Sequence, residues 1–160
     1  MKRILSIVLL LSLTLLSGTA YSQSLKRVNL DYCSINLPSD IQLFDQQNDG
    51  VIKARNYANS SNTFLCTYCT FPLDEEFNLY DRLYGEAMQL GIDIDQTGCY
   101  GVATDTPDQL LFTVAEFDSY SIIIGIFPHY NISKGTFLCL IDQRSDTQSL
   151  INMISSFRLR

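Results

Sequence analysis

Hydrophobic and polar residues alternate along much of the chain with a period of two, which is typical of half-buried β-strands. Pro38, Pro72 and the turn sequence Asp49-Gly50 interrupt this pattern and separate the runs from one another. The predicted strands span residues 31–37, 41–44, 51–57, 63–71, 98–103, 109–117, 120–127 and 136–141.

Two segments change to steps of three and four residues, which predicts amphipathic helices. The first helix is expected to begin at Asp74, which can cap it, and to end at Gly91 in the left-handed conformation. The second is expected to begin near Ser145 or Asp146. The apolar faces consist of Phe77, Tyr80, Leu83, Tyr84, Ala87 and Leu90 in the first helix, and of Leu150, Met153, Ile154 and Phe157 in the second.

The predicted element order is ββββ-α-ββββ-α. Because the strands come in hairpin-like runs, we expect a mainly antiparallel sheet with the helices packed on it. The fold class is therefore α+β.

The first 22 residues have the pattern of a secretory signal peptide. Lys2 and Arg3 precede the apolar run Ile4–Leu16, and small and polar residues follow it. The run has 13 residues, whereas a membrane-spanning helix needs about 20, so no stable membrane anchor is expected. We expect cleavage between Ala20 and Gln23, a single domain at residues 23–160, and a periplasmic or extracellular location.

The predicted mature chain is acidic. The whole chain has 11 basic and 17 acidic residues, and residues 1–22 contain two of the basic and none of the acidic ones. The mature chain therefore has nine basic and 17 acidic residues, a net charge of −8. A surface of this charge repels phosphate backbones, so a nucleic-acid partner is not expected.

Five cysteines raise the question of thiol chemistry: Cys33, Cys66, Cys69, Cys99 and Cys139. Cys66 and Cys69 have the spacing of a redox motif, but they lie in the predicted strand 63–71. Residues three apart in a strand point to opposite faces and lie about 10 Å apart, beyond the roughly 7 Å that a disulfide tolerates.

The simplest interpretation of the cysteines is that they are small buried core residues. The alternative is one cross-strand disulfide of Cys66 or Cys69 with Cys139, of which we prefer Cys66–Cys139. Zinc binding is disfavoured, because the chain has only one Cys-x-x-Cys pair and its other three cysteines are widely scattered.

His129 is the only histidine and is expected in an exposed loop between two strands. No nucleophile motif, phosphate-binding loop or cofactor motif accompanies it. We therefore expect no catalytic residue, no cofactor and no metal.

Two segments resemble a known family. Tyr32–Pro38 is similar to the first strand of the PsbP/Mog1-like α/β/α sandwich proteins, and Leu150–Phe157 is similar to their last helix. The resemblance spans about residues 28–158. It implies that the protein acts by binding another macromolecule.

We therefore expect an exported, non-enzymatic binding or accessory protein whose partner is another protein. The expected contact residues are Tyr100, Tyr120, His129 and Tyr130. One alternative is an acidic inhibitor or immunity protein for a basic secreted enzyme, since opposite charge steers association. A further, less favoured alternative is a thiol-dependent enzyme.

Overall fold

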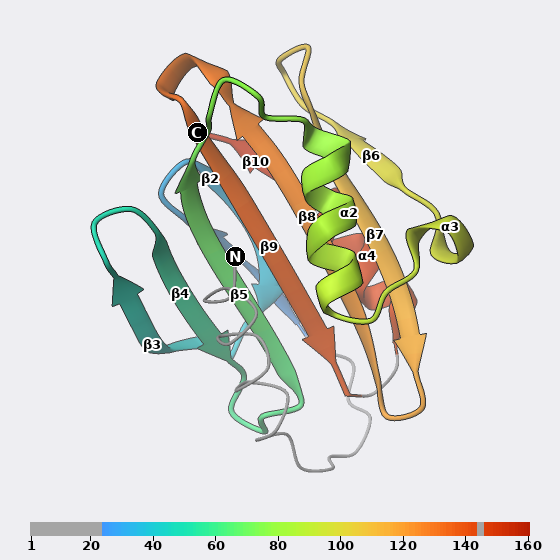
Figure 1. Ribbon diagram of the computed structural model, residues 1–160. Coiled ribbons are helices and arrows are strands. Elements are labelled where there is room, and N and C mark those ends of the chain that lie inside the picture. Colours follow the sequence, from blue (N-terminus) through green and yellow to red (C-terminus); the bar gives the residue numbers. More distant parts are fainter. Residues whose placement is uncertain (1–23, 144–145) are drawn as a thin grey trace.

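A computed structural model describes residues 24–143 and 146–160 and consists of two antiparallel sheets with helices (Figure 1). The larger sheet has the strand order β3-β4-β5-β9-β8-β7-β6. Its strands are β3 (Gln42–Asn48), β4 (Lys53–Ala58), β5 (Phe64–Pro72), β6 (Tyr100–Ala103), β7 (Gln109–Phe117), β8 (Tyr120–His129) and β9 (Lys134–Asp142).

The predicted signal peptide and its cleavage site lie outside the described residues. Within those residues, no helix is long and apolar enough to cross a membrane.

A smaller sheet and one helix cover the first face of the large sheet. The small sheet has the order β1-β2-β10, formed by β1 (Leu25–Asn29), β2 (Cys33–Pro38) and β10 (Arg158–Leu159). Helix α4 (Thr147–Ser155) packs between β2 and the strands β7, β8 and β9. The resulting core joins Ile35 of β2, Tyr68 of β5 and Leu150 of α4, all fully buried.

Helix α2 (Leu79–Gln89) and the short helix α3 (Ile94–Thr97) lie on the second face. Helix α2 packs on β7 and β8, and its Leu83 and Ala87 join a second core with Ile124 of β8. The large sheet is therefore a central layer with a separate hydrophobic core on each side.

The predicted α+β class and the antiparallel sheet are confirmed, but the element order is more complex than predicted. Strands β1 and β10 were not predicted, so the segment read as the first strand is β2. Both extra strands pair with β2, which otherwise would have two open edges. The helix α3 and a 3-10 turn, η1 (Tyr130–Ile132), were not predicted either.

The predicted helix ends are right in two of three cases. Asp146 caps α4 by accepting a hydrogen bond from Ser149 N at 3.0 Å. Gly91 follows α2 with a φ of 74°, the left-handed conformation that glycine adopts without strain. The expected cap Asp74 is wrong, because Asn78 performs this role and accepts from Asp81 N at 3.1 Å.

Candidate partner-binding site

A cleft of about 430 Å³ lies at the end of the large sheet where β8 meets the C-terminus. Four segments that are distant in sequence form its walls: the β6–β7 turn, the end of β8, the start of η1 and the last two residues. The lining residues are Thr106, Pro107, Asp108, Phe127, Pro128, His129, Tyr130, Asn131, Leu159 and Arg160.

His129 lies at the end of β8 and is only 7% exposed. The expectation of an exposed loop is therefore wrong, because β8 continues two residues past Phe127 and pairs His129 with Lys134 of β9. The His129 Nε2 atom shares a hydrogen bond of 2.8 Å with the Thr136 hydroxyl, and its ring lies 5.4 Å from the Tyr32 ring. Burial lowers the pKa of His129 to about 4, so the side chain is neutral at neutral pH.

The 3-10 turn η1 places two large side chains in solvent beside His129. Tyr130 is 55% exposed and Ile132 is 43% exposed. The turn ends at Ser133, which adopts a left-handed φ of 49° and whose carbonyl accepts a hydrogen bond from Leu73 N at 3.0 Å. The exposed side chains are thus carried by a backbone that is fixed to the end of β5.

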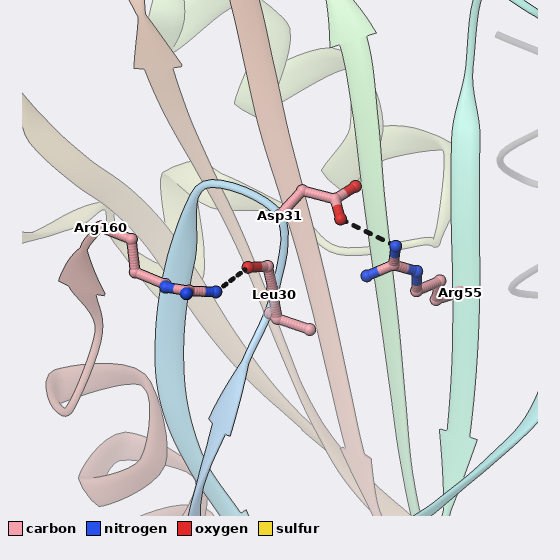
Figure 2. Close-up of polar contacts among 4 residues, drawn as sticks. All are labelled: Leu30, Asp31, Arg55 and Arg160. Atoms are coloured by element: carbon pink, nitrogen blue, oxygen red, sulfur yellow. Dashed lines mark hydrogen bonds and ion pairs between the residues drawn. The ribbon is translucent and has the colours of Figure 1, made fainter.

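Two arginines hold the β1–β2 turn from opposite sides, and one of them, Arg160, also lines the cleft (Figure 2). Arg160 Nη1 donates to the Leu30 carbonyl at 3.1 Å, and Arg55 Nη2 of β4 contacts Asp31 Oδ1 at 2.8 Å. The Arg160 backbone N–H also donates to the Tyr32 carbonyl at 3.1 Å. The C-terminal residue is therefore fixed by both its backbone and its side chain, and it forms a defined wall of the cleft.

The structure brings together only two of the four predicted contact residues. His129 and Tyr130 both line the cleft. Tyr100 is 50% exposed but lies on β6, where its ring packs 5.6 Å from Phe112. Tyr120 begins β8 at the opposite end from His129 and is stacked on Phe117 at 4.9 Å. Neither Tyr100 nor Tyr120 lines the cleft.

Sequence reasoning missed Ile132 and the C-terminal pair Leu159–Arg160. An exposed isoleucine between Asn131 and Ser133 was a usable signal, since large apolar side chains in polar turns are often contact residues. The C-terminal pair carried no such signal, because its position depends on pairing with β2 more than 120 positions earlier in the chain.

The cysteines are distributed over both faces of the large sheet. The extended strand predicted around Cys66 and Cys69 is confirmed, and the two residues belong to different cores. Cys139 of β9 lies on the α2 side with Cys69, whereas Cys66 lies on the α4 side. The preferred Cys66–Cys139 disulfide is therefore wrong, because the sheet separates the two side chains, and all five thiols are free.

Burial makes the thiols poor nucleophiles. It raises the pKa of Cys33 and of Cys69 to about 12, and it raises the pKa of Cys66 and Cys139 as well. The reactive species is the thiolate, which these groups do not form at neutral pH. Among the described residues, no group of three or more His, Cys, Asp or Glu side chains could hold a metal ion.

Comparison with known proteins shows the fold but not a family. No model of a protein family matches the sequence, and no curated protein matches it.

Among solved structures, a point mutant of the protein Mog1 matches with a TM-score of 0.50 at 9% identity, over 84% of this chain and 95% of that one. The Ran-binding protein Mog1p of Saccharomyces cerevisiae matches with a TM-score of 0.48 at 12% identity, over 85% of this chain and 95% of that one. A protein of Bacteroides thetaiotaomicron matches with a TM-score of 0.48 at 11% identity, over 80% of this chain and 45% of that one. The chain has the Mog1/PsbP-like fold that its two end segments predicted.

Proposed function

We propose that this is an exported, non-enzymatic protein that binds another protein through the cleft at the end of β8. The observation that carries the proposal is the pairing of a preformed hollow of about 430 Å³ with the exposed side chain of Tyr130, which lines it, and with the exposed Ile132 in the same turn η1. Tyrosines beside a pocket are frequent energetic centres of protein interfaces. A shared fold does not establish a function, which resides in the side chains of the site.

The cleft is suited to receive a side chain or a short loop from a partner. The buried residues Phe127 and His129 line it, and His129 is neutral, so this part of the lining adds no charge. Its walls are fixed by hydrogen bonds of Arg160 and Ser133. A rigid site loses little conformational entropy on binding, which favours affinity.

The same geometry argues against catalysis at this site. A histidine that acts as a base needs a nucleophile that can reach the substrate. The hydroxyl bonded to His129 belongs to Thr136, which is fully buried. The raised pKa values of the buried thiols argue in the same way against a thiol-dependent enzyme.

Export is part of the proposal and is supported by the basic residues Lys2 and Arg3 and the apolar run Ile4–Leu16. Amino-terminal sequencing of the protein recovered from outside the cytoplasm tests it. The expected first residue is Tyr21, Ser22 or Gln23. Recovery of a chain that starts at Met1 would contradict export with cleavage.

Binding through the cleft can be tested with two matched double variants used as immobilised bait in cell-envelope extract. One variant carries Tyr130→Ala, in the cleft lining, and Ile132→Ala, in the same turn η1. The other carries Tyr80→Ala and Met88→Ala, which are exposed to a similar degree on α2. We expect a protein that the wild type and the α2 variant retain and the cleft variant loses. Equal retention by all three baits, or by none, would contradict the proposal. Release by salt alone would instead favour an acidic inhibitor.

A further inference from the structure

A second surface lies on the small sheet, on the side that faces away from the large sheet. Cys33, Ile35 and Leu37 of β2 belong to the core, so the alternate residues of β2 and their partners on β1 and β10 point outward. Arg27 and Arg158 are both exposed, and Leu25 is 42% exposed, so this surface is open to solvent. The outward set includes the five residues that we call the outer face: Leu25, Arg27, Ser34, Asn36 and Arg158.

The guanidinium groups of Arg27 and Arg158 meet at the end of α4. Arg27 Nη1 donates to the carbonyl of Ser156. Arg158 Nη1 donates to the carbonyls on either side of it in the chain, Ser155 at 3.1 Å and Phe157 at 2.6 Å. Because three consecutive carbonyls bind the two groups, the groups are neighbours in space.

Strand β2 fixes the same arrangement from below. Arg27 Nε donates to Ser34 Oγ at 3.1 Å, and Arg27 Nη1 donates to Asn36 Oδ1 at 3.3 Å. Arg158 is the residue directly opposite Ser34 on β10, and side chains of such pairs share one face with Cβ atoms about 5 Å apart. Neutral oxygens thus hold both positive groups in place, which lowers the entropy cost of binding a ligand.

No carboxylate neutralises this pair of arginines. Among the described residues, neither Arg27 nor Arg158 forms an ion pair, and the Nη2 atom of each donates no hydrogen bond. The dipole at a helix C-terminus is equivalent to about −0.5 elementary charge, so about 1.5 of the two positive charges remain uncompensated. Capping of α4 therefore accounts for only part of the charge gathered here.

We propose that the outer face binds a carboxylate side chain of a partner protein between Arg27 and Arg158, with an apolar side chain of the same segment on Leu25. The planar guanidinium matches the two oxygens of a carboxylate. Leu25 lies two residues before Arg27 on the same side of β1, about 7 Å along the strand. The recognised segment therefore carries an acidic and an apolar residue at about this spacing.

The overall charge favours a carboxylate over a phosphate at this face. The chain has 11 basic and 17 acidic residues, so its field repels anions in proportion to their charge. A phosphate group carries nearly two negative charges at neutral pH, whereas a carboxylate carries one. The single charge benefits from both arginines and meets less of this repulsion.

The probe is the peptide acetyl-Ser-Leu-Thr-Glu-Ser-amide, in which leucine and glutamate are two residues apart. The matched control peptide has glutamine in place of glutamate. Binding to isotope-labelled protein is followed by NMR from the backbone N–H signals of Ser34 and Asn36 and from the side-chain N–H signals of the two arginines. The variants are Arg27→Gln and Arg158→Gln, and the charge-matched control is Lys53→Gln, an exposed basic residue of β4 outside the outer face.

We expect saturable shifts of these signals with the glutamate peptide. The glutamine peptide, and each arginine variant with the glutamate peptide, are expected to raise the dissociation constant about tenfold, whereas Lys53→Gln leaves it unchanged. Absence of saturable shifts, equal affinity for both peptides, or equal weakening by Lys53→Gln and Arg158→Gln would overturn the proposal. Inorganic phosphate that shifts the same signals at a lower concentration than the probe would overturn it in favour of a phosphate ligand.

The outer face and the cleft can fail independently. Arg158 precedes Leu159, which lines the cleft, and successive residues of a strand point to opposite faces. The two peptides differ in one carboxylate and are compared on the wild type, so this comparison decides the proposal even if an arginine variant fails to fold. Neither peptide test involves Tyr130 or Ile132.

Discussion

Arg55 Nη2 on β4 lies 2.8 Å from Asp31 Oδ1 in the β1–β2 turn, and this ion pair connects the large sheet to the small one (Figure 2). On the other side of the same turn, Arg160 binds the Leu30 carbonyl. The β1–β2 turn is therefore held by one residue of β4 and by the last residue, Arg160, which also lines the candidate site.

The energetic coupling of Arg55 and Asp31 can be measured with a double-mutant cycle. Both side chains are about a quarter exposed, 28% and 25%, so solvent screens the pair. We expect a coupling energy of about 0.5–1 kcal/mol between Arg55→Met and Asp31→Asn, from urea unfolding. A coupling of zero at low salt would show that the ion pair does not stabilise the turn.

The burial of His129 predicts a loss of stability as the pH falls. Its pKa is about 4 in the folded protein and about 6.5 when unfolded. Between these values the unfolded chain binds more protons, so the free energy of unfolding rises with pH. Lowering the pH from 7 to 4 is therefore expected to remove about 3 kcal/mol through this residue. Urea unfolding across this range measures it.

The control for this pH dependence is His129→Gln, which is expected to have a flatter profile than the wild type between pH 4 and 6.5. Glu86 acts in the opposite direction, because burial raises its pKa and so favours the folded state as this group takes up a proton. The comparison is therefore made between variants and not on the wild type alone. Parallel profiles for the wild type and His129→Gln would contradict the burial of a neutral imidazole.

Tyr68→Phe is expected to leave the stability unchanged or to raise it by about 1 kcal/mol. The Tyr68 side chain is fully buried, and among the described residues its hydroxyl has no hydrogen-bond partner. Burial raises the pKa of Tyr68, and the nearby Thr136 side chain and Tyr32 backbone act against this rise. Removal of an unsatisfied hydroxyl removes its desolvation cost. A loss of more than about 1 kcal/mol in thermal or urea unfolding would show that the hydroxyl is bonded.

The free thiols can be counted directly. Titration with Ellman's reagent in denaturant is expected to find all five thiols reduced. In the folded protein, Cys99, which is only partly buried, is expected to react first. The four buried cysteines, Cys33, Cys66, Cys69 and Cys139, are expected to react more slowly, because burial raises the pKa of each. Three thiols or fewer in denaturant would mean that a disulfide forms.

The sequence predicts those parts of the fold that depend on local patterns. The nine-residue strand β5 is dense in aromatic and β-branched residues, and the apolar face of α2 recurs at helical spacing, so both were predicted from their own residues. Strands β1 and β10 escape prediction because they exist by pairing with β2, and β10 has only two residues. The cap of α2 was misplaced because Asp74 and Asn78 are both suitable residue types, and tertiary packing decides between them.

The candidate site was less predictable than the fold. His129 and Tyr130 were predicted as contact residues, but the extension of β8 that buries His129 depends on its pairing with Lys134. Arg160 joins the cleft through hydrogen bonds to Leu30 and Tyr32, residues near the start of the domain. Contacts between segments this far apart leave no periodicity or spacing in a single sequence.

The most direct test of binding through the cleft is site-specific photo-cross-linking in cells that express the protein. A photoreactive phenylalanine analogue replaces Tyr130 at the cleft or, as a matched control, Tyr80 on α2, which is also exposed. The account predicts a defined cross-linked protein from position 130 and none of the same mass from position 80. The same product from both positions, or none from position 130, would contradict it.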